Sequence, residues 1–194
     1  MKTITLFFLI ALTSSPSTIH CRTLIIPNDA NLIESTCRRT PNYNVCIQSL
    51  KSNPASLSAD VRGLALIMVK VMASKANDGI NIIRELQRSG PSSALNSCAG
   101  KYNAILVGDI PQATQALQGG NAKFAESAAN DVANEATFCE NGFAGRSPIT
   151  TQNNVMRDVS VVTAAIPSSP TLHHPPPPPS NSLLSFIPSL PTTL

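Results

Sequence analysis

Residues 32–46, LIESTCRRTPNYNVC, place two cysteines on either side of a short polar segment that contains Pro41. The Thr-Pro-Asn step around this proline predicts a turn, and the residues on both sides have the apolar spacing of short helices. We therefore expect helices over Asp29–Arg39 and Asn42–Leu50. A disulfide between the two cysteines would pin these helices together as a hairpin.

Four cysteines lie in the part of the chain that is expected to fold: Cys37, Cys46, Cys98 and Cys139. An export signal precedes them, and because disulfides persist in oxidising compartments, we expect disulfides here. Metal binding is the weaker alternative, since neither pair has the two-residue spacing of a zinc knuckle. The fifth cysteine, Cys21, lies at the predicted end of the signal and is expected to leave with it, whereas an earlier cleavage would leave Cys21 as an odd thiol.

The first 21 residues have the pattern of a secretory signal peptide. Lys2 supplies the positive start, and the apolar run at residues 4–12, ITLFFLIAL, is too short to span a bilayer. No later segment reads as long and apolar enough to cross a membrane. We therefore expect residues 1–21 to be removed and the protein to be secreted without a membrane anchor.

Apolar residues at three- and four-residue steps predict four longer helices after the hairpin. The first runs over Ser58–Arg88, with Ser58 as its N-cap, and the second begins near Ser92 and is interrupted or kinked at Pro111. Asn121 is the expected N-cap of the third, and the fourth begins near Thr150. Four antiparallel helices with short links predict the all-α class and an up-down four-helix bundle.

Residues 22–166 have the length of a single domain. Residues 167–194 are rich in proline and serine and carry no acidic or basic side chain, which predicts a disordered or polyproline-like tail. The formal net charge of +3 is small and scattered, so nucleic acid is not an expected partner.

Catalysis is not expected from this chain. Its histidines are His20, His173 and His174, so the domain between them offers no imidazole base for a nucleophile. The HExxH, Walker A and GxGxxG motifs are also missing from the sequence. We therefore predict no catalytic residue, no metal site and no cofactor.

The segment GGNAKF, residues 119–124, is the most unusual local feature of the domain. It places Lys123 in the first turn of a predicted helix, where a cation opposes the helix macrodipole. Local conflicts of this kind sometimes mark a functional site. In the alternative interpretation Lys123 is merely solvated and Phe124 is the first core residue of the helix, and the residues alone leave both open.

Three further segments complete a pattern that begins with LIESTCRRTPNYNVC: KYNAILVGDIPQATQAL from residue 101, GNAKFAESAANDVANEATFCENGF from residue 120, and DVSVVTAAI from residue 158. In this order they resemble the plant invertase and pectin methylesterase inhibitor family over residues 31–166, and within it the invertase-inhibitor branch. The resemblance implies a four-helix bundle with an N-terminal helical hairpin. It also implies the disulfides Cys37–Cys46 and Cys98–Cys139.

The resemblance further implies a secreted inhibitor of acid invertase (β-fructofuranosidase), in the cell wall or alternatively the vacuole. In that branch a Pro-Lys-Phe motif between two bundle helices enters the substrate cleft of the enzyme. The motif corresponds here to Ala122, Lys123 and Phe124, so alanine replaces the proline.

Two other functions stay open from the sequence. The same scaffold serves as a pectin methylesterase inhibitor, which uses the bundle face rather than the loop, so pectin methylesterase is the alternative partner. The segment HHPPPPPS at residues 173–180 is similar to extensin-like proline-rich segments, which favours a structural wall protein more weakly. Pro167 is expected to end the last helix early, which leaves that helix with fewer apolar groups to bury.

Overall fold

The computed structural model describes residues 29–167, and all of the regular secondary structure in that range is helical. The predicted signal peptide and the segment after Pro167 lie outside the described residues. The expectations for Cys21 and for the proline-rich tail therefore stay predictions.

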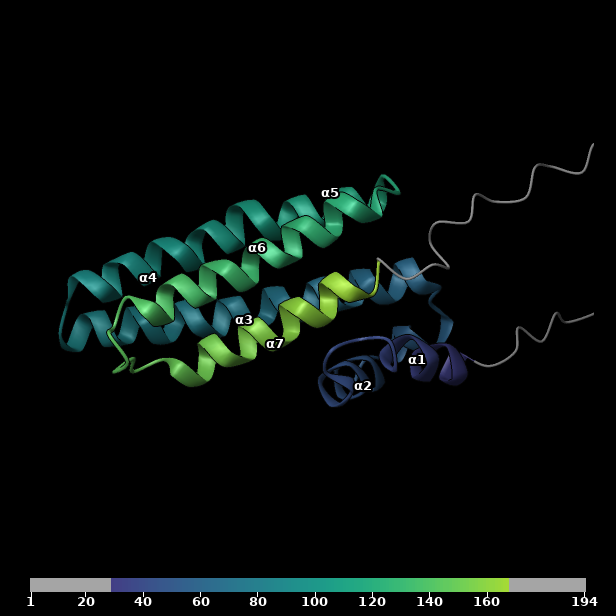
Figure 1. Cartoon of the computed structure of the whole chain (residues 1–194), viewed down its shortest axis with the longest axis horizontal. Coiled ribbons are helices and arrows are strands. Elements are labelled where there is room, and N and C mark those ends of the chain that lie inside the picture. Colours follow the sequence, from purple (N-terminus) through teal and green to yellow (C-terminus); the bar gives the residue numbers. More distant parts are fainter. Residues whose placement is uncertain (1–28, 168–194) are drawn as a thin grey trace, which may run out of the picture.

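The core of the molecule is an up-down bundle of four helical rods, as predicted (Figure 1). The rods run back and forth along the long axis, and α6 packs against its neighbours α4, α5 and α7. The rods are α3 (Val61–Ser89), α4 (Ser93–Ala104) continued by α5 (Ile110–Gln118), α6 (Ala122–Asn141) and α7 (Thr150–Ala165).

The start of α3 differs from the prediction. Asp60, not Ser58, is the N-cap, and its Oδ1 accepts a hydrogen bond from the Gly63 N–H at 2.7 Å. Residues Pro54–Ser58 instead form a separate 3-10 turn, η1. A proline is well suited to begin a short helix of its own, because the first helical N–H needs no partner.

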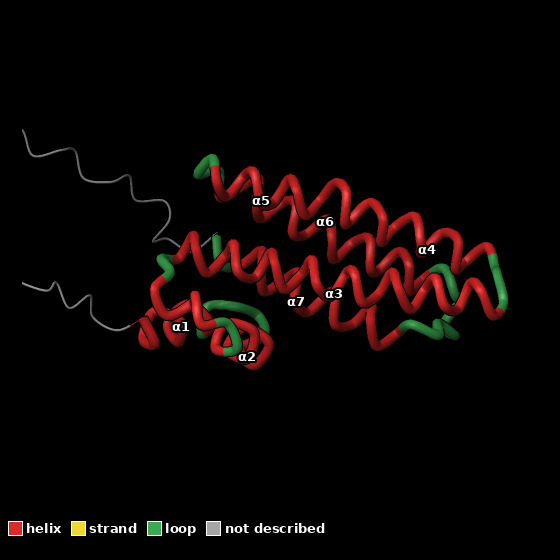
Figure 2. The backbone as a smooth tube through the Cα atoms, turned by 180° about the vertical axis from the view of Figure 1, so that it is seen from behind, coloured by secondary structure: helices red, strands yellow, loops and turns green. Residues whose placement is uncertain are grey.

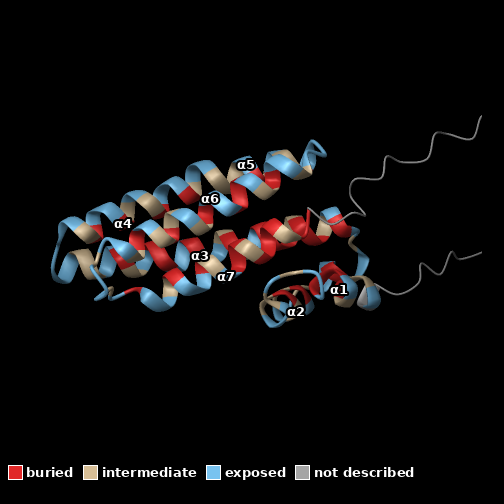
Figure 3. Cartoon of the chain, in the orientation of Figure 1, coloured by how far each residue is buried: buried red, intermediate tan, exposed pale blue. Residues whose placement is uncertain are grey.

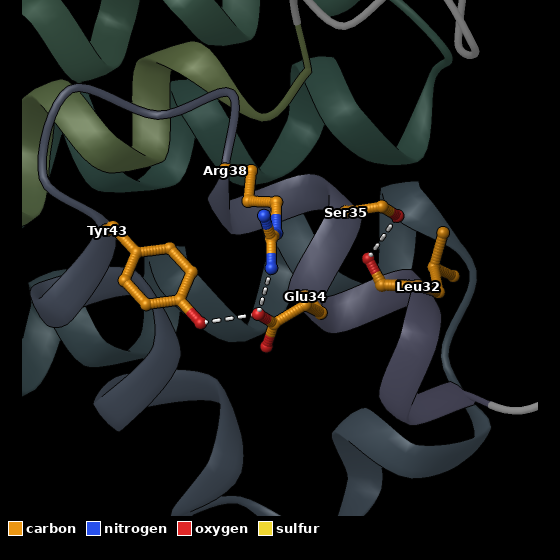
Figure 4. A network of polar contacts seen from close by, with 5 residues as sticks. All are labelled: Leu32, Glu34, Ser35, Arg38 and Tyr43. Atoms are coloured by element: carbon orange, nitrogen blue, oxygen red, sulfur yellow. Dashed lines mark hydrogen bonds and ion pairs between the residues drawn. The ribbon is translucent and has the colours of Figure 1, made fainter.

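A hairpin of two short helices, α1 (Asp29–Cys37) and α2 (Tyr43–Lys51), packs against the end of the bundle where α3 begins (Figure 2). Glu34 joins them through its Oε1, which accepts from the Tyr43 hydroxyl at 2.8 Å and from Arg38 at 3.0 Å (Figure 4). The hydrogen bonds from Tyr43 and Arg38 lower the pKa of Glu34.

Both disulfides implied by the resemblance are present. The first joins Cys37 at the end of α1 to Cys46 in α2, and the second joins Cys98 in α4 to Cys139 in α6. All four half-cystines are buried. The first bond closes the hairpin, and the second ties two rods of the bundle to each other.

Buried residues recur along each helix of the bundle (Figure 3), and most of their side chains are aliphatic. Among residues 29–167 the one fully buried aromatic ring is that of Tyr102, which lies so close to Gly79 of α3 that a Cβ on Gly79 would overlap the ring. The Tyr102 hydroxyl donates to Asn153 Oδ1 at 2.9 Å, and the Asn153 amide donates to Glu140 at 2.6 Å. This chain of hydrogen bonds connects α4, α7 and α6 through the core.

The helix continues through Pro111, with a wider turn just before the proline. One π turn, Ile105–Asp109, precedes the proline, and the Ile110 N–H donates to the carbonyl of Ile105, five residues back. A proline has no N–H and its ring crowds the carbonyl four residues back, so a wider turn relieves the conflict. The rod therefore continues through α4 and α5 without a loop (Figure 2).

The π turn places Asp109 beside the acidic face of α6. Its Oδ2 is buried and accepts no hydrogen bond within residues 29–167. Burial, followed by the nearby charges of Asp131 and Glu135, raises the pKa of Asp109 to about 6. Lys101 of α4 pairs with Glu135 at 3.2 Å and leaves Asp109 without a cation of its own in this part of the chain.

Replacing Gly79 by alanine should destabilise the protein. The added Cβ would clash with the Tyr102 ring, and overpacking of this kind costs about 2 kcal/mol in the free energy of unfolding. Gly100 of α4 is the matched control, since a Cβ there meets no atom within 4 Å. Gly100→Ala should instead stabilise the helix by about 0.5–1 kcal/mol, and urea denaturation of both variants measures the difference in sign.

Replacing Asp109 by asparagine should flatten the pH dependence of stability. Because the folded protein holds the Asp109 proton more tightly than the unfolded chain, the contribution of Asp109 to the free energy of unfolding falls as pH rises from about 4 to about 6. Asp109→Asn removes this contribution, which thermal unfolding across that pH range would detect. Asp158→Asn, which alters an exposed carboxylate of α7, is the control, and an unchanged slope in Asp109→Asn would contradict the assignment.

Candidate functional site

The link between α5 and α6 is a fixed turn that closes the C-terminal end of α5. The Asn121 N–H donates to the carbonyl of Ala116 at 2.7 Å, and the Gly120 N–H donates to that of Leu117 at 3.1 Å. This is the Schellman arrangement, which requires a left-handed residue, and Gly120 supplies it with φ of +75°. The backbone of the turn is therefore held by its own hydrogen bonds.

Asn121 begins α6 as predicted. Its side chain accepts a hydrogen bond from the Phe124 N–H at 3.2 Å, which satisfies one of the unpaired donors of the first turn. Ala122 is consequently the first helical residue. The turn and the cap together determine where the next two side chains leave the helix.

Lys123 points into solvent, with 80% of its side chain exposed. Its ammonium group lies 3.0 Å from Glu126 Oε2, one turn further along α6. A surface ion pair of this kind contributes at most about 1 kcal/mol, so it does not hold the lysine away from a binding partner. The cation opposes the positive end of the helix dipole, as the sequence indicated.

Phe124 is 58% exposed, so the alternative interpretation in which it is the first core residue of its helix is wrong. The buried face of α6 is centred near Ala125, and Phe124 is displaced from Ala125 by about 100° around the helix. It forms one edge of a shallow groove of about 400 Å³ on the surface of α5 and α6, together with Gln112, Gln115, Ala116 and Asn121. An exposed aromatic side chain beside a groove is typical of a surface that binds another molecule.

Arg62 is the residue at this site that sequence reasoning missed. It lies in the first turn of α3, and its guanidinium comes within 3.6 Å of the position that a Cβ on Gly120 would occupy. No local sequence pattern connects two residues so far apart along the chain. Two cations therefore lie at the turn, Lys123 from α6 and Arg62 from α3.

The described residues, 29–167, offer no other chemistry at this site. They contain no group of three or more metal-ligating side chains, and none of the helices in this range meets the length and hydropathy of a membrane span. The carboxylates of Glu126, Asp131 and Glu135 follow one helix and do not face each other across a cleft. The arrangement suits binding of a partner with acidic and apolar groups.

Residues 31–166 match the family model described as "Plant invertase/pectin methylesterase inhibitor". The chain is 38% identical over 141 residues to the "Cell wall / vacuolar inhibitor of fructosidase 1" of Arabidopsis thaliana, which covers 72% of this chain and 69% of that protein. It is 29% identical over 126 residues to the "Pectinesterase inhibitor" of Actinidia deliciosa, covering 63% and 68%.

The fold is also that of a solved structure. The crystal structure of mutant form A of a pectin methylesterase inhibitor from Arabidopsis superimposes with a TM-score of 0.61, covering 70% of this chain and 95% of that one. The sequence identity in this superposition is 17%, so it demonstrates a shared helical architecture and nothing about the target.

Proposed function

The chain belongs to the plant invertase/pectin methylesterase inhibitor family, and we propose that its target is an acid invertase, a β-fructofuranosidase. The family consists of enzyme inhibitors, and this chain is accordingly an inhibitor of invertase or of pectin methylesterase. The observation that carries the choice of invertase is the exposure of Lys123 and Phe124 on a fixed turn.

The chemistry of a glycosidase cleft favours this pairing. Such clefts contain paired carboxylates, and the ammonium group of Lys123 is complementary to them in charge. The exposed ring of Phe124 would fill apolar space beside the sugar-binding groups. Because the turn is held by its own hydrogen bonds, little conformational freedom is lost on binding.

The comparisons support the same choice. The relative named for fructosidase inhibition is 38% identical to this chain, against 29% for the pectinesterase inhibitor of Actinidia deliciosa. The two disulfides fit an oxidising compartment, so we place the protein outside the cytosol, in the cell wall or alternatively in the vacuole. Pectin methylesterase is the second candidate target, because one of the similar proteins is named as a pectinesterase inhibitor.

Lys123→Ala should weaken inhibition of acid invertase at least tenfold, or about 1.4 kcal/mol in binding free energy, because the charge complementary to the cleft is lost. Sucrose hydrolysis, titrated with the oxidised mature protein at acidic pH, gives the inhibition constants. Lys75→Ala is the matched control, since Lys75 also forms an exposed pair three residues apart, with Asp78, but on α3.

Methanol release from pectin is measured with the same three proteins. No effect of the wild-type chain on sucrose hydrolysis at about micromolar concentration would remove the invertase proposal. If the same preparation instead prevents pectin methylesterase from releasing methanol, the target is pectin methylesterase.

Ala122→Pro should tighten inhibition by a few fold. Ala122 is the first residue of α6, where the N–H needs no helical acceptor and a proline pre-sets the backbone angle. The gain comes from a turn that is more fully ordered before binding. Inhibition constants from sucrose hydrolysis test the prediction, with circular dichroism to confirm equal helix content, and weaker inhibition by Ala122→Pro would contradict it.

A further inference from the structure

Arg62 occupies a position that the stability of its own helix does not explain. It lies in the first turn of α3, where a cation opposes the helix macrodipole. The nearest carboxylate in sequence, Asp60, uses its Oδ1 to cap the helix at the Gly63 N–H. Within residues 29–167 the guanidinium has no hydrogen bond or ion pair.

The side chain of Arg62 extends along the α5–α6 turn. It lines a niche of about 10 Å³, the size of about one water molecule, with Leu117, Gly120 and Ala122. Gly120 has no side chain, so the guanidinium reaches the edge of the turn itself, at the end of the bundle where α3 and α6 both begin (Figure 1). The end of the bundle that presents Lys123 therefore presents a second cation, from a different helix.

From this placement we infer that Arg62 is a second cationic contact of the inhibitor, and that it pairs with a carboxylate at the rim of the acidic cleft that receives Lys123 and Phe124. This inference rests on the proposed function. In this arrangement the α5–α6 turn would enter the cleft of the enzyme. Because the N-terminus of α3 lies beside the α5–α6 turn, Arg62 would contact the rim of that cleft. Its planar fork of N–H donors fits a carboxylate in a bidentate manner, which the ammonium of a lysine cannot do.

A rim charge acts mainly on the rate of association and on its dependence on salt. Arg62→Gln should therefore slow association with acid invertase about fivefold at low ionic strength and reduce the salt dependence of the rate. Arg62→Lys keeps the charge and loses the fork, so it should retain the association rate but dissociate faster. Biolayer interferometry at about 20 mM and about 200 mM salt separates the two effects.

Arg84→Gln is the matched control, because Arg84 is an exposed arginine near the other end of α3. It removes the same charge from the same helix and should leave both rates unchanged. Equal effects of Arg62→Gln and Arg84→Gln would show that only net charge matters and would overturn the inference. An unchanged melting temperature in Arg62→Gln confirms that the effect lies in binding.

The Lys123→Ala variant, measured in parallel, separates this inference from the proposed function. If Lys123→Ala weakens binding and Arg62→Gln does not, the second contact is rejected while the invertase target stands. If the wild-type protein does not bind acid invertase, both fail together. Losses in both single variants, with a further loss in the double variant, are the expected result.

Discussion

The disulfide between Cys98 and Cys139 is the constraint on which presentation of the site depends. It joins two cysteines that lie 41 positions apart in the sequence, and the segment between them contains the π turn, α5 and the α5–α6 turn. In the loop-entropy model a bond across such a segment disfavours the unfolded chain by about 4 kcal/mol. Since α6 runs from this bond to the turn as one helix of 20 residues, holding its far end also sets the direction of its first turn.

The packing of the bundle reinforces this rigidity. The inner face of α6 is mostly alanine, which lets neighbouring helices approach closely and leaves little volume for rearrangement. The ring of Tyr102 is accommodated only because Gly79 has no Cβ, and its hydroxyl is satisfied by Asn153. Because this large side chain packs against Gly79 of α3 at its ring and bonds Asn153 of α7 at its hydroxyl, it helps to set the register of α3, α4 and α7.

Such a scaffold suits an inhibitor better than an enzyme. Inhibition requires that a few side chains be presented in one geometry, and a bundle held by disulfides does this. The disulfides and the hairpin stabilise the scaffold, whereas the proposed choice of target rests on the turn, with Ala122, the exposed Lys123 and Phe124, and Arg62 beside them.

Local sequence determined the helices, the N-cap at Asn121 and the position of the turn, because apolar spacing and capping chemistry act within a few residues. The resemblance to a family supplied the two disulfide pairings. Only the tertiary structure decided that Phe124 is exposed, that Pro111 is absorbed by a π turn, and that Arg62 lies against Gly120. The exposure of Phe124 and the position of Arg62 depend on which helix covers which face and which helix begins beside the turn. Long-range packing sets those contacts, and no local pattern records them.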